Sequence, residues 1–99
     1  MSTIMQRTVR KIQELGWEVS ASDRERVEFH RRVQGELLIA TVNIQERWWT
    51  VGGSDRAPTY VACKQGLGGR GYAGQGWPER MVADAVQGVN QAAGVSDEG

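Results

Sequence analysis

One histidine, one cysteine and a glycine-rich stretch are the parts of the sequence with residue types that can do chemistry. As a general base, His30 needs a nucleophile and an orienting acid beside it; as a metal ligand it needs further ligands at binding spacing. The chain has no second histidine, and Cys63 is distant in sequence. The alternation over residues 26–33 places His30 with Glu28 and Arg32, so we interpret it as a surface-strand histidine.

Cys63 and the glycine-rich stretch have structural interpretations. Cys63 follows Val61 and Ala62, which indicates a small buried hydrophobe. Residues 66–71 have the G-x-G-x-x-G spacing of dinucleotide-binding loops, in which a helix follows directly. The next helix is predicted to begin only at Pro78. We therefore expect no catalytic residue, no cofactor and no metal, and we predict that the chain is not an enzyme.

Two adjacent tryptophans indicate a binding surface. On a strand, Trp48 and Trp49 must point to opposite faces. Trp49 shares its face with Val51, so Trp49 is predicted to enter the core and Trp48 to face outward. Tryptophan is enriched among the residues that carry binding energy at interfaces. Trp48 is therefore the predicted anchor for a partner.

Arginines on and beside the predicted strands extend this surface. The chain has ten arginines and only two lysines. We predict that Arg31, Arg32 and Arg47 pair with acidic groups of a partner. The glycine-rich loop around Arg70 and Tyr72 is predicted to adapt to the same partner.

The acidic residues leave two roles open for these arginines. Twelve basic and twelve acidic residues give a formal charge of zero, which disfavours a strongly electrostatic nucleic-acid binder. Glu25, Glu28 and Glu46 can pair with the arginines across strands, or can mimic phosphates towards a partner that itself binds nucleic acid. Nucleic-acid binding through the basic strands and the glycine-arginine loop, with stacking on Trp48 or Tyr72, is the alternative prediction.

Hydrophobic periodicity predicts the elements that position these residues. A helix is expected over 3–15, with Thr3 and Gln6 at capping-box spacing, and a second over 78–93. Period-two alternation predicts strands over 17–21, 26–33, 37–45, 48–51 and 59–64. Residues 65–76 hold six glycines and are predicted to form a loop without regular structure. The result is an α+β fold of two layers, in which an antiparallel sheet of four to five strands carries both helices on one face.

Length and composition indicate the number of domains, the absence of a membrane-spanning run and the expected location. A chain of 99 residues forms one domain, which we place at 1–95, followed by a frayed acidic tail at 96–99. The longest aliphatic run, residues 37–40, is far short of the roughly 20 residues of a membrane-spanning helix. The N-terminus has no apolar secretory segment, and the single cysteine cannot form an internal disulfide. A cytoplasmic location is expected.

The predicted helix-sheet-helix order resembles double-stranded-RNA-binding domains and the small HicA-type toxins. At the place of the toxin's catalytic histidine this chain has Asp23–Arg26, and at the place of the RNA-binding lysines it has Glu79 and Arg80. In size and charge balance the chain also looks like small phage-encoded proteins that block host defence complexes. These observations predict a small non-enzymatic protein-binding module, an inhibitor or adaptor encoded by a phage or mobile element and directed at a host complex.

Overall fold

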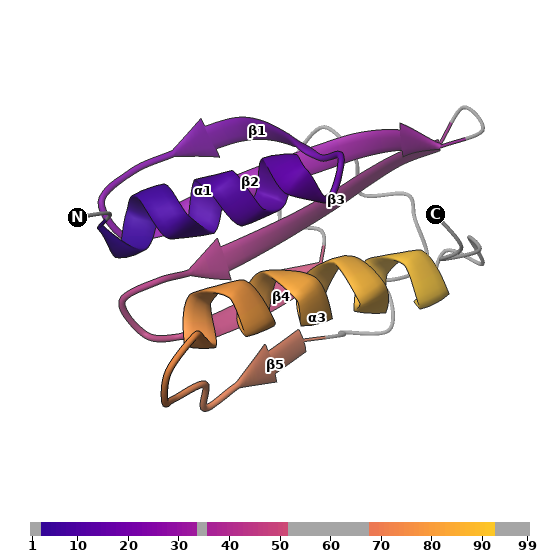
Figure 1. Cartoon of the computed structure of the whole chain (residues 1–99). Helices are drawn as coiled ribbons and strands as arrows, with labels where there is room; N and C mark the ends of the chain where they lie inside the picture. The colour runs from indigo at the N-terminus through magenta and orange to yellow at the C-terminus, as the bar shows by residue number, and fades with distance from the viewer. Residues whose placement is uncertain (1–2, 34–35, 52–67, 93–99) are drawn as a thin grey trace.

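The computed structural model describes residues 3–33, 36–51 and 68–92 of the chain. Helix α1 (Ile4–Glu14) leads into a sheet and helix α3 (Trp77–Ala92) follows it (Figure 1). The strands are β1 (Glu18–Ser22), β2 (Arg26–Val33), β3 (Glu36–Asn43), β4 (Trp48–Val51) and β5 (Gly68–Arg70). The predicted α+β class and the α-β-β-β-β-β-α order are confirmed.

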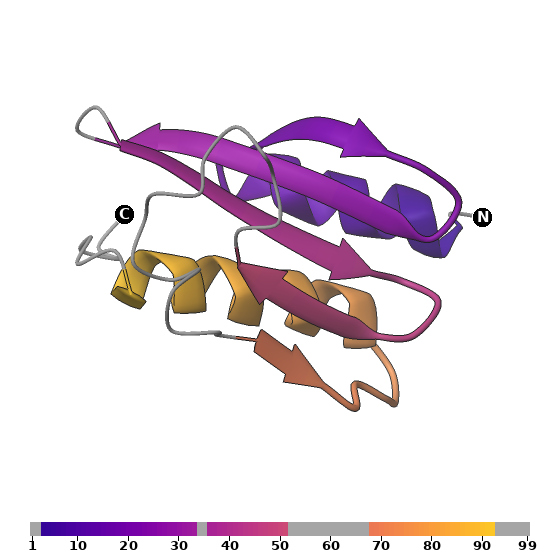
Figure 2. The same cartoon turned by 180° about the vertical axis from the view of Figure 1, so that it is seen from behind.

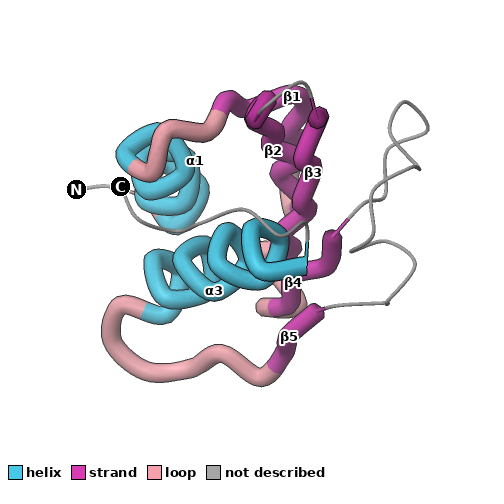
Figure 3. Tube along the Cα trace, turned by 90° about the vertical axis from the view of Figure 1, so that its right-hand side faces the viewer, coloured by secondary structure: helices cyan, strands magenta, loops and turns pink. Residues whose placement is uncertain are grey.

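The strands form one antiparallel sheet in the order β1-β2-β3-β4-β5, so neighbours in sequence are neighbours in space. Both helices lie on the same side of the sheet (Figure 3). Seen from behind, the other side presents strands with no described helix in front of them (Figure 2). We call these two sides the helix-covered face and the helix-free face.

Local signals fix the first helix. The Thr3 hydroxyl accepts a hydrogen bond from the backbone N–H of Gln6 at 3.1 Å, and the Gln6 side chain accepts one from the backbone N–H of Thr3 at 2.9 Å. This is the predicted capping box. After the cap residue Leu15, Gly16 adopts a φ of +86°, a conformation that glycine permits without steric cost.

The core lies between the sheet and the helices. Val27, Phe29 and Leu38 project from the helix-covered face and are fully buried. Trp17 packs edge-on against Phe29, with ring centroids 5.3 Å apart. Among the described residues of the helices, the buried apolar ones are Ile12 of α1 and Trp77, Met81, Val82, Ala85, Val86 and Val89 of α3. In α3 these residues recur at helical spacing, so they form one apolar stripe that packs against the sheet.

Strand β5 corrects the prediction that residues 65–76 are a loop throughout. Gly69 pairs with Trp49, and a Cβ on Gly69 would lie only 2.5 Å from Trp49 Nε1. Glycine is therefore required there so that the backbone can approach the indole. The predicted strand over 59–64, Cys63 and the acidic tail lie outside the described residues.

Strand β1 departs from simple alternation. Val19 pairs with Phe29, whereas Ala21 pairs with Glu28, so Ser20 is an extra residue in β1. This β-bulge turns Ala21 outward, and Ala21 is exposed instead of sharing the buried face that the sequence predicts.

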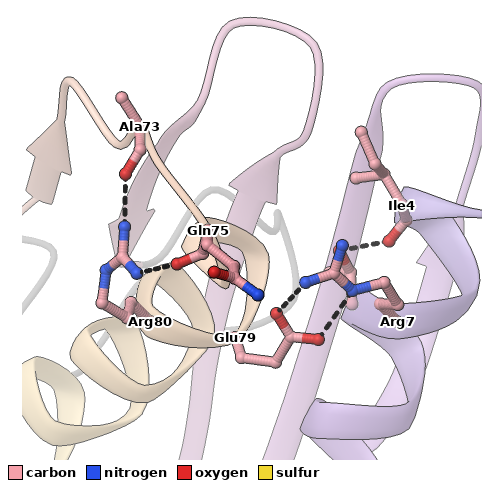
Figure 4. A network of polar contacts seen from close by, with 7 residues as sticks. Ile4, Arg7, Ala73, Gln75, Glu79 and Arg80 are labelled. Carbon is pink, nitrogen blue, oxygen red and sulfur yellow. Dashed lines mark hydrogen bonds and ion pairs between the residues drawn. The ribbon is translucent and has the colours of Figure 1, made fainter.

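Polar contacts hold the two helices and the last turn together (Figure 4). The Arg7 guanidinium donates to both carboxylate oxygens of Glu79, at 2.9 and 2.8 Å, and so joins α1 to α3. Arg80 donates to the backbone carbonyls of Gln75 and Ala73, which fixes the turn between β5 and α3. Within the described residues, no helix is long and apolar enough to cross a membrane.

Candidate functional site

The two tryptophans of β4 take opposite faces, as predicted. Trp49 is only 7% exposed and belongs to the core. Trp48 is half-buried and pairs with Asn43 of β3 on one side and with Arg70 of β5 on the other. Because side chains of directly paired residues point to the same face, Trp48 and Arg70 stand together on the helix-free face.

A shallow pocket of about 850 Å³ surrounds this pair. Trp48 and Thr50 line it from β4, and 68–70 line it from β5. Glu46 also lines it and accepts a hydrogen bond from the indole N–H of Trp48 at 3.0 Å. An indole, a cation and a carboxylate therefore lie within one open hollow, beside glycines that add no side-chain bulk.

Arg26 extends this group across the sheet. It pairs with Asn43, which itself pairs with Trp48, so Arg26, Trp48 and Arg70 stand in one row. Adjacent strands are roughly 4.8 Å apart, which places the backbone of Arg26 about 10 Å from that of Trp48. The sequence alone does not single out Arg26, because its neighbours in this row depend on strand pairing.

The structure separates the three arginines that were predicted to act together. Arg31 lies on the helix-covered side, with its guanidinium 5.6 Å from the ring centroid of Trp17. Arg32 is exposed on the helix-free face. Arg47 has a φ of +61°, and its guanidinium lies 4.5 Å from the ring centroid of Trp77 at the start of α3. Arg31 and Arg47 thus each lie against a tryptophan near the helices, away from Arg32 on the helix-free face.

Tyr72 serves to lock β5 against α3. Its hydroxyl accepts the indole N–H of Trp49 at 2.8 Å and donates to the Asp84 carboxylate at 2.7 Å. Partial burial, followed by the hydrogen bond to Asp84, raises the pKa of Tyr72 to about 12. Both hydrogen bonds of the Tyr72 hydroxyl are therefore made within the fold.

His30 has neighbours that the sequence did not reveal. The Ser20 hydroxyl contacts Nδ1 of His30, and a carboxylate oxygen of Glu18 lies 3.4 Å from Nε2. His30 therefore has a hydroxyl and a carboxylate beside it, which the alternation of the strand alone does not indicate. Glu18 pairs directly with His30 across the strands, and the bulge at Ser20 brings the hydroxyl alongside. A register and a bulge cannot be read from single-strand periodicity.

Glu79 and Arg80, at the start of α3, both make contacts within the chain. Glu79 is bonded to Arg7, which holds the pKa of its carboxyl below the ordinary value. Arg80 donates to two backbone carbonyls. Among residues 3–33, 36–51 and 68–92, no group of three His, Cys, Asp or Glu side chains could hold a metal ion.

Comparison of the chain with protein-family models, with curated proteins and with solved structures finds no match.

Proposed function

We propose that the chain is a small non-enzymatic binding module, an inhibitor or adaptor, that binds a protein partner through the helix-free face of its sheet. The observation that carries this proposal is the position of Trp48. It stands half-buried on the helix-free face, beside Arg70, while its neighbour Trp49 fills the core.

Trp48 is poorly explained by folding alone. The large aromatic contribution of β4 to the core comes from Trp49, and Trp48 has its indole N–H bonded to the exposed Glu46. A tryptophan that is half in water leaves apolar area available for a partner to cover. Such residues are enriched among the few that dominate interface energetics.

The charged residues around Trp48 are of both signs, which supports a protein as the partner. Arg26 and Arg70 occupy the same row and can pair with carboxylates of a partner. Glu46 beside Trp48 and Glu28 on β2 add negative charge to the same face. Mixed charge of this kind complements a protein with both signs of charge better than it complements a uniform phosphate backbone.

The proposal extends to the kind of partner and its location. In size and charge balance the chain looks like phage-encoded inhibitors, so we propose a bacterial host complex as the target. The single cysteine, Cys63, fits a reducing compartment, and we propose the cytoplasm.

Nucleic-acid binding is the second candidate. Arg26, Arg32 and Arg70 are all exposed on the helix-free face, and Trp48 offers a surface on which a base could stack. This candidate predicts that affinity falls steeply with salt, with a log–log slope of about −0.7 to −0.9 for each neutralised phosphate. The protein-binding proposal predicts a shallower dependence.

Affinity capture separates the two candidates. Tagged wild-type protein is incubated with bacterial lysate, with and without nuclease, and the eluate is analysed by mass spectrometry. The proposal predicts a defined protein complex that survives nuclease and is depleted by Trp48→Ala. Ile4→Ala is the matched control, because Ile4 is also a large hydrophobe, 39% exposed, but lies on α1. Proteins that disappear after nuclease would overturn the proposal in favour of nucleic-acid binding.

A further inference from the structure

The helix-free face carries a second group of side chains, around His30, that partner binding at Trp48 does not use. We propose that Ser20 is an activated nucleophile that accepts a short aliphatic acyl group from a small activated ester or thioester. Ser20 is then a covalent modification site on the binding module.

Strand pairing brings the three reacting side chains together. Glu18 stands directly opposite His30 in the β1–β2 pair. Ser20 follows two residues later on β1 and therefore shares the face of Glu18. Because Ser20 is the extra residue of the bulge, it has no paired residue on β2, and its hydroxyl contacts Nδ1 of His30. Bulges often re-aim side chains in this manner at functional sites.

The contacts are compatible with an assignment of protons in which His30 is neutral and Nδ1 is the acceptor. With its proton on Nε2, the imidazole faces the Glu18 carboxylate at 3.4 Å with a donor. Nδ1 is then unprotonated and accepts the hydroxyl proton of Ser20. His30 is thus placed as the general base for Ser20, and Glu18 is a positioning residue that holds the imidazole in this tautomer.

A pocket of about 490 Å³ lies over these groups and suggests the class of acyl donor. Ser20 and His30 line it together with Leu37, Ile39 and Arg32. Leu37 and Ile39 supply an apolar wall for a short aliphatic chain. The Arg32 guanidinium supplies positive charge in the same pocket, which favours the negative charge that develops on the carbonyl oxygen during attack.

The acyl transfer balances with the ester or thioester as the only co-reactant. The Ser20 oxygen bonds to the carbonyl carbon while its proton passes to Nδ1 of His30. The bond from that carbon to the leaving oxygen or sulfur then breaks, and the leaving group takes the proton from His30. The products are an O-acyl serine and an alcohol or thiol, and His30 returns to its starting state.

The test uses the full chain and p-nitrophenyl butyrate as the acyl donor. The reaction is quenched in acid, the intact mass is measured, and the butyrylated residue is located by peptide mapping. We expect a single adduct on Ser20 and release of p-nitrophenol in proportion to protein. Adducts only on other residues, or no adduct at all, would overturn the proposal without any variant being needed.

Variants then test the roles of the three side chains. Ser20→Ala is expected to abolish the adduct, and Ser22→Ala, on the same strand, to retain it. His30→Gln is expected to slow acylation by about 100-fold, the lower end of general-base effects. Glu18→Gln is expected to slow it less, with partial recovery in Glu18→Asp, which a merely structural role would not produce. Equal rates in wild type and His30→Gln would contradict activation by the imidazole.

This inference is independent of the binding function. Acylation of Ser20 with unchanged capture of a partner, or capture without acylation, would separate the two proposals.

Discussion

Trp48 and Trp49 are adjacent residues of the same type, but they lie on opposite faces of the sheet and differ in burial. On the helix-covered face, Trp49 is enclosed by β5 and α3, and its N–H is bonded to Tyr72. On the helix-free face, Trp48 remains half-exposed and bonds its N–H to the exposed Glu46. The same side chain therefore stabilises the fold on one face and is available to a partner on the other. Residue type alone does not assign a role; the environment of the side chain does.

Two of the described glycines show how closely the backbone packs around Trp49. Gly69 and Gly88 are the points at which β5 and α3 approach the Trp49 indole, and a Cβ at either would lie within 2.6 Å of it. In contrast, Gly71 has a φ of +84° and no atom within 4 Å of such a Cβ, so it serves the backbone conformation of the turn. Close packing is thus concentrated around Trp49.

The largest predicted difference between the faces is in stability. Trp49→Ala is expected to lower the free energy of unfolding by about 3–5 kcal/mol, because it leaves a cavity in the core. Trp48→Ala is expected to change it by less than about 1 kcal/mol, because the side chain is half-exposed and few atoms lose contacts. Urea denaturation followed by fluorescence or circular dichroism measures both. Equal losses for the two variants would contradict the difference in packing between Trp48 and Trp49.

A single methyl group tests how tightly α3 packs on Trp49. Gly88→Ala should favour the helix on propensity alone, by about 1 kcal/mol. Its Cβ would, however, lie 2.6 Å from Cη2 of Trp49, so we expect a net loss of about 1–3 kcal/mol from overpacking. Thermal unfolding gives the sign directly. A stabilised variant would show that the indole can move away freely.

Removing the hydrogen-bond partner of the Trp49 indole is predicted to cost more stability than removing that of the Trp48 indole. Tyr72→Phe leaves the N–H of the buried Trp49 without its partner and should cost about 1–3 kcal/mol. Glu46→Ala removes the partner of Trp48, where water can replace it, and should be within about 0.5 kcal/mol of wild type. Chemical denaturation of the two variants side by side checks this; a costlier Glu46→Ala would contradict it.

The smallest predicted effect is on the pH dependence of stability, through the ion pair between Arg7 of α1 and Glu79 of α3. The hydrogen bonds from Arg7 lower the pKa of Glu79 in the folded chain. A lowered folded-state pKa means that this stabilisation is present above the ordinary pKa of glutamate and is lost as the pH falls through the folded-state value. Because both side chains are more than a third exposed, the effect should be modest. Glu79→Gln should flatten the acid limb of the stability–pH curve, and an unchanged limb would show that the ion pair contributes nothing.

Period-two alternation and capping signals were sufficient for much of this architecture. The faces of Trp48 and Trp49, the span of β2 and the capping box at Thr3 follow from residues near one another in sequence. Strand β5 could not be predicted, because its glycines are explained by contact with Trp49, about twenty positions earlier. Among candidate site residues, the same limit applies to Ser20 and His30, whose contact depends on the β1–β2 register and its bulge.

Site-specific crosslinking tests the role of the helix-free face most directly. A photoreactive phenylalanine analogue is placed at Thr50, exposed on the helix-free face beside Trp48, or at Gln87, exposed on α3. Each protein is irradiated in nuclease-treated bacterial lysate and the adducts are identified by mass spectrometry. If the helix-free face binds the partner, we expect a defined protein adduct from position 50 and none from position 87. Adducts from position 87 with none from position 50 would contradict it.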